Sequence, residues 1–487
     1  MRNRFKCLLL SILMLPCLFL LYACNETEEP ANLTALSSSM ITLEYYTTTY
    51  NEEEKTPGVT VKLAGEEISS DNYSVEYFKN VNVGEAVVKV TAKTDSKIIS
   101  GSAERNFTIA RVNKVVSNYE QLSAALNNKN YVNLSLNGNI VIPEGQTLTV
   151  RKGVSLTFGV FTLENNGTLV NYGSILLSSK PAGEGIIQNN GTITANVNTR
   201  EGLLNSFTYA NRIVLNGNLT SDTAEMLPSI VIRATDQSYD FVLDLNGYDI
   251  ETNIYIVGNQ TNKLKVVLTN TTSESSTVGV NLESCQYGLI VLGDGNETID
   301  VTLNKVNFLG YEGGIATNGN NSNGLITAKN CIFESKNLSA ENPKAASVGA
   351  YLPAKYGYVF NECTFVGYTA YYAKSGNHVL NKCTLQGEGG TYFNPSHYGN
   401  GCQPTGSALV CDSAVNYKQP LAIYITGGTF KSQKGYGIEE VSTSAGGQTV
   451  SYGEISVSAG AKMECLLGEY FTQNNAIDTS KNVIEEE

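Results

Sequence analysis

Three hexapeptides in the second half of the chain decide the fold: Leu303-Asn304-Lys305-Val306-Asn307-Phe308, Phe360-Asn361-Glu362-Cys363-Thr364-Phe365 and Leu380-Asn381-Lys382-Cys383-Thr384-Leu385. They align without gaps, and Ala328–Phe333 is a looser fourth copy. Successive copies begin 20 to 32 residues apart, which is the spacing of coils that stack strand upon strand. We expect the fourth and sixth positions of each copy to point inward and the asparagine to lie at a bend.

Weaker repeats extend the pattern toward the N-terminus. The segment Leu134–Ile140 recurs as Ile213–Leu219, 79 residues later, and Asn166–Leu169 recurs as Asn190–Ile193, 24 residues later. Internal repeats of this kind predict a solenoid, which we place at residues 131–487. Before it, residues 113–130 contain the capping-box pattern Ser117-x-x-Glu120 and the helical apolar spacing Leu122, Ala125 and Leu126, which predict a short capping helix.

Residues 36–112 have a different pattern, with short segments in which apolar and polar residues alternate. The predicted strands are Val59–Leu63, Tyr73–Tyr77, Ala86–Thr91 and Phe107–Ile109. A period of two gives each strand one buried face, and breaks such as Pro57-Gly58 are turn signals. We therefore expect a compact antiparallel β-sandwich here.

The first 24 residues have the organisation of a secretory signal. Arg2, Arg4 and Lys6 precede an uncharged run that ends in Leu21-Tyr22-Ala23-Cys24. This end resembles the lipobox of bacterial lipoproteins, which implies that residues 1–23 are a removable signal peptide and that Cys24 becomes lipidated. An uncleaved anchor, or an ordinary signal with a chance cysteine, is the alternative.

Residues 24–35 then form an acidic tether with few apolar side chains to bury. In Gram-negative surface lipoproteins, acidic residues after the lipidated cysteine often accompany export to the outer face. The resemblance therefore implies an outer-membrane lipoprotein at the cell surface of a Gram-negative bacterium, attached to the membrane through its N-terminal lipid.

The repeats resemble the pectate-lyase-like right-handed parallel β-helix proteins, whose coils share the Asn-x-Cys-x-Phe-like strand start, the short N-terminal capping helix and the Asn-Gly-Thr turns. This resemblance covers residues 113–487. The sandwich resembles bacterial immunoglobulin-like modules through the alternating run from Tyr73 to Val90. Together they imply an all-β fold, a right-handed parallel β-helix (solenoid) preceded by a small immunoglobulin-like β-sandwich. The β-helix fold alone carries lyases, hydrolases, tailspikes and adhesins.

Composition excludes some partners. Charged residues make up 16% of the chain, and there are 28 Tyr, 45 Gly and no Trp. Without Arg2, Arg4 and Lys6 the processed chain carries 30 basic and 46 acidic residues, a net charge of −16. A chain this acidic is a poor ligand for nucleic acid, whose binding depends on neutralising phosphates.

The cysteines do not predict a metal site or another cofactor site. Seven remain after Cys24, and no CxxC pair or Cys/His cluster occurs among them: Cys285, Cys331, Cys363, Cys383, Cys402, Cys411 and Cys465. Adjacent coils would bring Cys363 and Cys383 within disulfide range. Their register with Val306 instead favours a reduced stack of small buried side chains, and both readings stay open.

Catalytic candidates are few, and we predict no catalytic residue. The two histidines are His378, in a column expected to face inward, and His397, in a loop. Asp240 and Asp244 share a strand face that we interpret as solvated. The Asn-x-Asp, Asp-Asp, Gly-His-Gly and Arg-x-Lys motifs of the pectin hydrolases do not occur in the processed chain, and no arginine follows Arg233 to serve a lyase.

Tyrosine is concentrated between residues 351 and 398, where the chain has eight. Tyr371 and Tyr372 are adjacent, so in a strand they point to opposite sides and we expect at least one to lie outside. The Gly- and Asn-rich segment 387–401 suggests a loop beside them. We therefore predict a ligand-binding face made of Tyr368, Tyr371, Tyr372, Tyr392, Tyr398 and His397, in which rings stack on sugars or contact a protein. Alternatively, these tyrosines only fill or cover the coils.

Three functions remain. The first is a surface lipoprotein whose β-helix binds a glycan or a partner protein, as an adhesin does, without turnover. The second is a polysaccharide lyase or glycoside hydrolase with an unrecognised site. The third is a structural component of the cell surface. The missing catalytic motifs favour the first.

Overall fold

The computed structural model describes residues 33–221, 225–233, 239–259, 262–293, 295, 298–318, 323–338, 347–394, 401–417, 419–441, 449–458, 460–472 and 476–478. The described residues up to Arg111 form one compact unit, and those from Val112 onward form a second. In neither unit do the described residues include a helix that is long and apolar enough to span a membrane.

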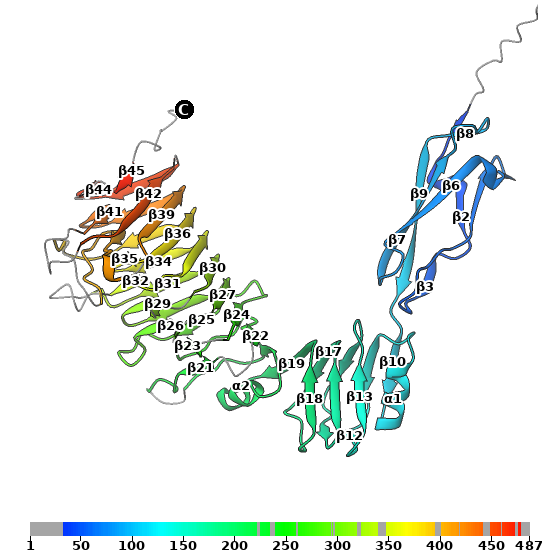
Figure 1. Ribbon diagram of the computed structural model, residues 1–487, viewed down its shortest axis with the longest axis horizontal. Helices are drawn as coiled ribbons and strands as arrows, with labels where there is room; N and C mark the ends of the chain where they lie inside the picture. Colours follow the sequence, from blue (N-terminus) through cyan, green and yellow to red (C-terminus); the bar gives the residue numbers. More distant parts are fainter. Residues whose placement is uncertain are drawn as a thin grey trace, which may run out of the picture. The chain divides into compact units, whose positions relative to one another are not determined.

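The first unit is a small β-sandwich (Figure 1). One sheet contains β2 (Ile41–Leu43), β4 (Val59–Leu63) and β5 (Glu66–Glu67), and the other contains β3 (Thr47–Thr49), β9 (Ser102–Ala110), β7 (Gly84–Ala92) and β6 (Tyr73–Phe78). The short strands β1 (Thr34–Ala35) and β8 (Ile99–Ser100) pair with each other, and the 3-10 turns are η1 (Ser38–Met40) and η2 (Ser70–Asn72). All four predicted strands are confirmed.

The sandwich is held together by the inward faces of its strands. Val88 and Val90 of β7, and Phe107 and Ile109 of β9, pack against Val61 of the other sheet in one buried cluster. Side chains two positions apart share a face, so the alternation in sequence becomes a continuous apolar layer. Burial of each such side chain contributes about 1.5–3 kcal/mol.

The second unit is a parallel β-helix whose strands stack in long sheets (Figure 1). Every strand pairing within these sheets is parallel. The longest sheet orders its strands as they occur in the chain: β10 (Asn113–Val116), β11 (Asn133–Leu136), β14 (Ser155–Thr157), β17 (Ser174–Leu177), β19 (Thr192–Val197), β20 (Arg212–Leu215), β22 (Tyr239–Asp244), β24 (Leu264–Thr269), β27 (Ile299–Asn304), β30 (Leu325–Lys329), β33 (Gly357–Asn361), β36 (Gly376–Asn381), β39 (Leu421–Thr426), β42 (Tyr452–Val457) and β45 (Ile477–Asp478).

Two further long sheets complete the later coils. The nine-stranded sheet contains β21 (Ile230–Arg233), β23 (Ile254–Val257), β26 (Tyr287–Leu292), β29 (Gly313–Asn318), β32 (Val348–Leu352), β35 (Thr369–Ala373), β38 (Leu409–Cys411), β41 (Tyr436–Glu440) and β44 (Gly468–Phe471). The seven-stranded sheet contains β25 (Thr277–Gly279), β28 (Asn307–Gly310), β31 (Ile332–Ser335), β34 (Thr364–Gly367), β37 (Thr384–Gly387), β40 (Gly428–Ser432) and β43 (Ala461–Cys465). The first coils instead use β13 (Thr147–Val150), β16 (Thr168–Asn171) and β18 (Ile186–Asn189) in one sheet and β12 (Ile140–Ile142) and β15 (Leu163–Asn165) in another.

The repeated hexapeptides lie in the predicted register. Their last residues, Phe308, Phe333, Phe365 and Leu385, are consecutive partners in the seven-stranded sheet, and all four are buried. The ring centroids of Phe308 and Phe333 are 5.4 Å apart, and those of Phe333 and Phe365 are 5.0 Å apart. Offset rings at these distances contribute about 0.5–1.5 kcal/mol per pair beyond their burial.

The hexapeptide also sets the corner between two sheets. Its third residue, which is Lys305, Asn330, Glu362 or Lys382 in the four copies, has φ between 50° and 55°. This left-handed conformation turns the chain sharply from the longest sheet into the seven-stranded one. At the second position, Asn361 and Asn381 end their strands at the bend, as the repeat predicted, and the Asn381 amide donates to Asn361 Oδ1 at 2.8 Å, which ties the two bends together.

The cysteines at the fourth position of the hexapeptide are reduced, which confirms the predicted stack of small buried side chains. Cys331, Cys363 and Cys383 are buried thiols in the same column as Val306, and all seven cysteines after Cys24 are unpaired. The Cys363 thiol contacts the Asn361 carbonyl at 3.4 Å. The column therefore consists of small side chains that fill the corner of each coil.

Two helices interrupt the strand pattern. In α1 (Tyr119–Asn127), Leu122, Ala125 and Leu126 are buried as predicted. The cap is shifted by one residue, because the Asn118 side chain accepts the Gln121 N–H at 2.9 Å and Gln121 accepts the Ser117 N–H.

The second helix, α2 (Arg200–Ser206), was not predicted. Thr199 caps it by accepting the Gly202 N–H at 3.0 Å. In the sequence, α1 lies between β10 and β11, and α2 lies between β19 and β20. In both cases the two strands that flank the helix pair with each other in the longest sheet.

The prediction that Asp244 lies on a solvated strand face is wrong. Its side chain is buried, and its carboxylate accepts from the Arg212 guanidinium at 2.9 Å and from the Thr271 hydroxyl. Arg212 is its neighbour on the preceding coil, which a strand-parity argument cannot reveal. Asp240 is exposed as expected.

Candidate functional site

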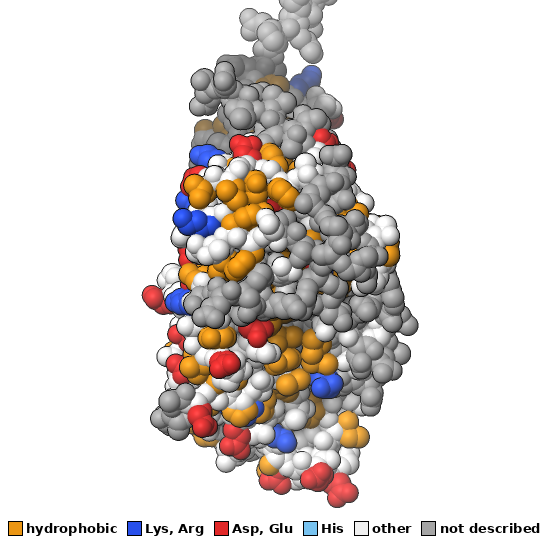
Figure 2. Space-filling view, turned by 90° about the vertical axis from the view of Figure 1, so that its left-hand side faces the viewer, with side chains coloured by type: hydrophobic (Ala, Val, Ile, Leu, Met, Phe, Trp, Pro, Cys, Tyr) orange, Lys and Arg blue, Asp and Glu red, His pale blue; other side chains and the backbone are white. Residues whose placement is uncertain are grey.

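A long connection covers the outer side of the nine-stranded sheet near its C-terminal end. It joins β37 to β38, and its segments 388–394 and 401–408 are described. The N–H groups of Thr405 and Gly406 both donate to Thr369 Oγ1 at 3.0 Å, which fixes the connection to β35. All residues of β35 are buried. Figure 2 views this side of the β-helix, where hydrophobic side chains lie among acidic and basic ones.

Tyr371 points into the core of the β-helix. Its hydroxyl lies 2.6 Å from His378 Nδ1, and His378 Nε2 lies 2.8 Å from the Ser375 carbonyl oxygen. Because a carbonyl only accepts, Nε2 carries the proton, and Nδ1 accepts from the tyrosine. Burial lowers the pKa of His378 to about 4, so the ring is neutral and stacks on Tyr358 at 4.3 Å. The prediction that His378 faces inward is confirmed.

Tyr372 points to the opposite side, yet it is also fully buried. Its hydroxyl donates to Asp412 Oδ2 at 2.7 Å. Burial and the charge of Asp412 raise the pKa of Tyr372 well above its usual value, which keeps the hydroxyl a donor. Tyr368 is buried too, and its hydroxyl donates to the Thr391 carbonyl. The expectation that one of the adjacent rings lies outside is wrong, because the connection covers the outer side of the strand.

The same connection is held by a buried ion pair. Lys374 and Asp412 are 0% exposed, and Lys374 Nζ lies 2.8 Å from Asp412 Oδ2 and 2.8 Å from the Gly401 carbonyl. The ammonium also lies 5.1 Å from the ring centroid of Tyr417, a favourable cation–π distance. Beside it, burial raises the pKa of the Cys402 thiol to about 12. This cluster anchors the connection and leaves the thiol neutral.

A buried carboxyl group lies under the next part of the connection. Glu439 of β41 is 0% exposed, and Thr405 Oγ1 donates to its Oε2. Burial raises the pKa of Glu439 to about 7, and the hydroxyls of Thr405, Tyr392 and Ser407 oppose that rise. The carboxyl group therefore changes its charge near neutral pH.

Half-buried aromatic rings follow one another beside this carboxyl group, and we call Tyr392, Tyr436 and Phe471 the aromatic row. The ring centroids of Tyr392 and Tyr436 are 5.6 Å apart, and those of Tyr436 and Phe471 are 5.3 Å apart. Tyr392 was predicted as a ligand-binding residue, whereas Tyr436 and Phe471 were missed. They lie in different coils, at the two ends of their strands, so no local period joins them.

The β-helix also has a polar groove of about 220 Å³. Some of its lining residues come shortly before Tyr392 and Tyr436 in the sequence. It is lined by Gln386, Gly387, Glu388, Lys431, Ser432, Gln433 and Glu464. Lys431 and Glu464 form an exposed ion pair at 3.0 Å across adjacent strands. Amide, ammonium and carboxylate groups here supply both donors and acceptors.

Three predicted site residues, Cys24, His397 and Tyr398, lie outside the described residues. Within the described part of the chain, no three His, Cys, Asp or Glu side chains come together in a way that could hold a metal ion. The structure thus brings one predicted residue, Tyr392, together with two that were not predicted.

Comparison of the chain with models of protein families, with curated proteins and with solved structures finds no match.

Proposed function

We propose that this chain is a lipid-anchored cell-surface protein whose β-helix binds a glycan through the aromatic row, without turnover. The observation that carries the proposal is the aromatic row itself, three half-buried rings in contact with one another, on a side of the β-helix whose covering connection is fixed by buried anchors. Binding residues on connections that a rigid scaffold positions are a common arrangement.

The chemistry of the row suits a sugar chain. A tyrosine or phenylalanine ring offers an apolar face to the C–H groups of a sugar, while neighbouring polar side chains bond its hydroxyls. Two of the three rings belong to strands of adjacent coils, paired through Tyr436 with Gly468 and Glu439 with Phe471. A row that extends across coils can contact successive units of an extended glycan.

Recognition fits the site better than catalysis does. His378 is enclosed and neutral, and Asp412 is tied to Lys374 and Tyr372. Neither group is placed to exchange a proton with a ligand at the surface. The resemblance of residues 21–24 to a lipobox supports the anchor, and the acidic tether supports the surface location.

The binding proposal is tested with soluble residues 25–487 on an immobilised panel of microbial, plant and mucosal glycans. We expect specific retention, and we expect Tyr436→Ala or Phe471→Ala to weaken binding about tenfold, which corresponds to about 1.4 kcal/mol for one lost ring contact. Tyr424→Ala is the matched control, because Tyr424 is an exposed tyrosine on β39 of the longest sheet.

If Tyr436→Ala and Phe471→Ala are retained on the glycan as well as the wild type is, the aromatic row is not the binding surface. Retention of a protein but of no glycan would replace the glycan by a partner protein. For the anchor, Cys24→Ser should abolish incorporation of a labelled fatty acid, and protease added to intact cells should degrade the wild-type protein. Unchanged labelling, or full protection from the protease, would contradict lipidation or surface exposure respectively.

A further inference from the structure

An arginine on β9 occupies a position whose side chain points toward the core of the sandwich. Arg105 lies between Ala103 and Phe107 on the inward face of the strand, and its partner on β7 is the fully buried Val88. Arg105 itself is half-buried, so it places a cation at the accessible end of an otherwise apolar column of the strand.

The described residues satisfy little of its hydrogen-bonding capacity. Nη1 donates one long hydrogen bond, 3.4 Å, to the Ser38 carbonyl, and the guanidinium carbon lies 5.3 Å from the centroid of the Tyr46 ring. No carboxylate among the described residues lies within ion-pair distance of Arg105. A guanidinium has five N–H donors, so most of them are free for a ligand.

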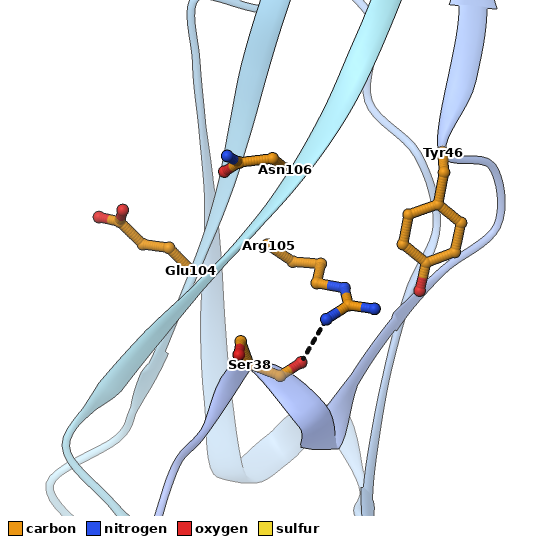
Figure 3. A pocket seen from close by; sticks show the side chains of 5 residues that line it. All are labelled: Ser38, Tyr46, Glu104, Arg105 and Asn106. Carbon is orange, nitrogen blue, oxygen red and sulfur yellow. Dashed lines mark hydrogen bonds between the residues drawn. The ribbon is translucent and has the colours of Figure 1, made fainter.

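These groups line an open pocket of about 390 Å³, shown in Figure 3. Arg105 extends toward the ring of Tyr46, while Glu104 leaves β9 on the other side. Asn106 also belongs to that other side, where its amide donates to Glu85 at 2.7 Å. Glu104 and Asn106 also contribute to the lining of the pocket, with Ser38, Tyr46 and Arg105, but their side chains point away from the guanidinium.

The aromatic wall of the pocket is held in place. The Tyr46 hydroxyl accepts the Leu43 N–H of β2 at 3.2 Å, and the side chain remains 41% exposed. A ring fixed at its hydroxyl end offers an apolar surface without losing further rotational freedom on binding.

We propose that this pocket binds the carboxylate of an acidic sugar unit. The planar fork of Arg105 matches a carboxylate in two parallel hydrogen bonds, and the fixed ring of Tyr46 can pack on the apolar face of the sugar that carries it. This site lies on the sandwich, and it does not depend on the aromatic row of the β-helix.

The experiment uses the full processed chain, residues 25–487, and two disaccharides that differ in one group: cellobiouronic acid, with a C6 carboxylate, and cellobiose, with a hydroxymethyl group. Binding is measured by isothermal titration at low and high salt. We expect the acid to bind at least tenfold more tightly than cellobiose, with weaker binding at high salt. The Tyr424→Ala variant, at an exposed tyrosine on β39 outside both sites, should bind it unchanged.

Two variants test the assignment to Arg105. Arg105→Lys keeps the charge but removes the planar fork, and we expect it to lower the affinity for cellobiouronic acid at least tenfold. Lys62→Gln removes an exposed cation from the other sheet and should leave that affinity unchanged. An unchanged melting temperature of Arg105→Lys shows that it folds, and Tyr46→Leu provides a second variant if it does not. Equal binding of the two disaccharides, wild-type affinity of both site variants, or binding only of inorganic phosphate or an acidic peptide would overturn the proposal.

Discussion

Replacing Glu439 with glutamine should stabilise the protein above neutral pH and leave its stability unchanged in acid. The side chain is fully buried, and its pKa rises from 4.5 to about 7 because burial disfavours the charged form. A carboxyl group with a raised pKa in the folded state stabilises the fold below its unfolded pKa, and that contribution is lost as the pH rises.

The structure sets the magnitude and the pH window. A shift from 4.5 to about 7 corresponds to about 3 kcal/mol of stability, lost progressively between about pH 4.5 and pH 7. Glutamine is neutral at every pH, and its carbonyl oxygen can still accept from Thr405. At pH 8 we therefore expect Glu439→Gln to be more stable than the wild type by up to about 3 kcal/mol, and at pH 4.5 the difference should vanish.

The assay is urea unfolding of residues 25–487 at both pH values, followed by far-ultraviolet circular dichroism. His378, whose pKa is lowered to about 4, destabilises the protein as the pH falls, but it is present in both proteins and cancels in their difference. Glu464→Gln, at an exposed carboxylate, is the control and should show little pH-dependent gain. A Glu439→Gln midpoint equal to that of the wild type at pH 8 would refute the account of this group.

Three further predictions concern the β-helix. Lys374→Met should destabilise it by about 3–5 kcal/mol in urea unfolding because Asp412 stays buried without its cation, and adding Asp412→Leu should restore part of the loss; a loss near zero would contradict a buried pair. Phe365→Ala should cost about 3–5 kcal/mol in the same assay by leaving a cavity between stacked rings, so an effect below 1 kcal/mol would mean that the coils collapse around it. Adding a thiol reductant should leave the melting temperature unchanged because Cys363 and Cys383 are thiols, and a lower melting temperature would indicate a disulfide.

The coil repeat could be predicted from the sequence because its information is local. In Phe360–Phe365, side-chain parity and the recurring asparagine define the inward positions and the corner, and the neighbouring coil repeats them in register. The cysteine column and the inward position of His378 follow from the same register.

The candidate site could be predicted only in part because it depends on contacts between distant segments. Strand parity correctly placed Tyr371 and Tyr372 on opposite sides, but the burial of Tyr372 depends on Asp412, 40 residues away, and on a connection that Lys374 holds through the Gly401 carbonyl. Tyr436 and Phe471 become neighbours only when their coils stack. Exposure in a solenoid is therefore decided by the connections, which carry no repeat.

The position of α2 has a consequence for how such a chain can lengthen. A helix that closes the end of a stack also occurs within it, between β19 and β20, and the strand after each helix ends in a leucine that opens the same Leu-Asn-Gly-Asn segment, Leu136–Asn139 after α1 and Leu215–Asn218 after α2. The longest sheet continues past this helix without interruption. Duplication of one block, helix included, would add coils without redesigning either terminus, and each added coil would move the C-terminal surface about 4.8 Å farther along the stack.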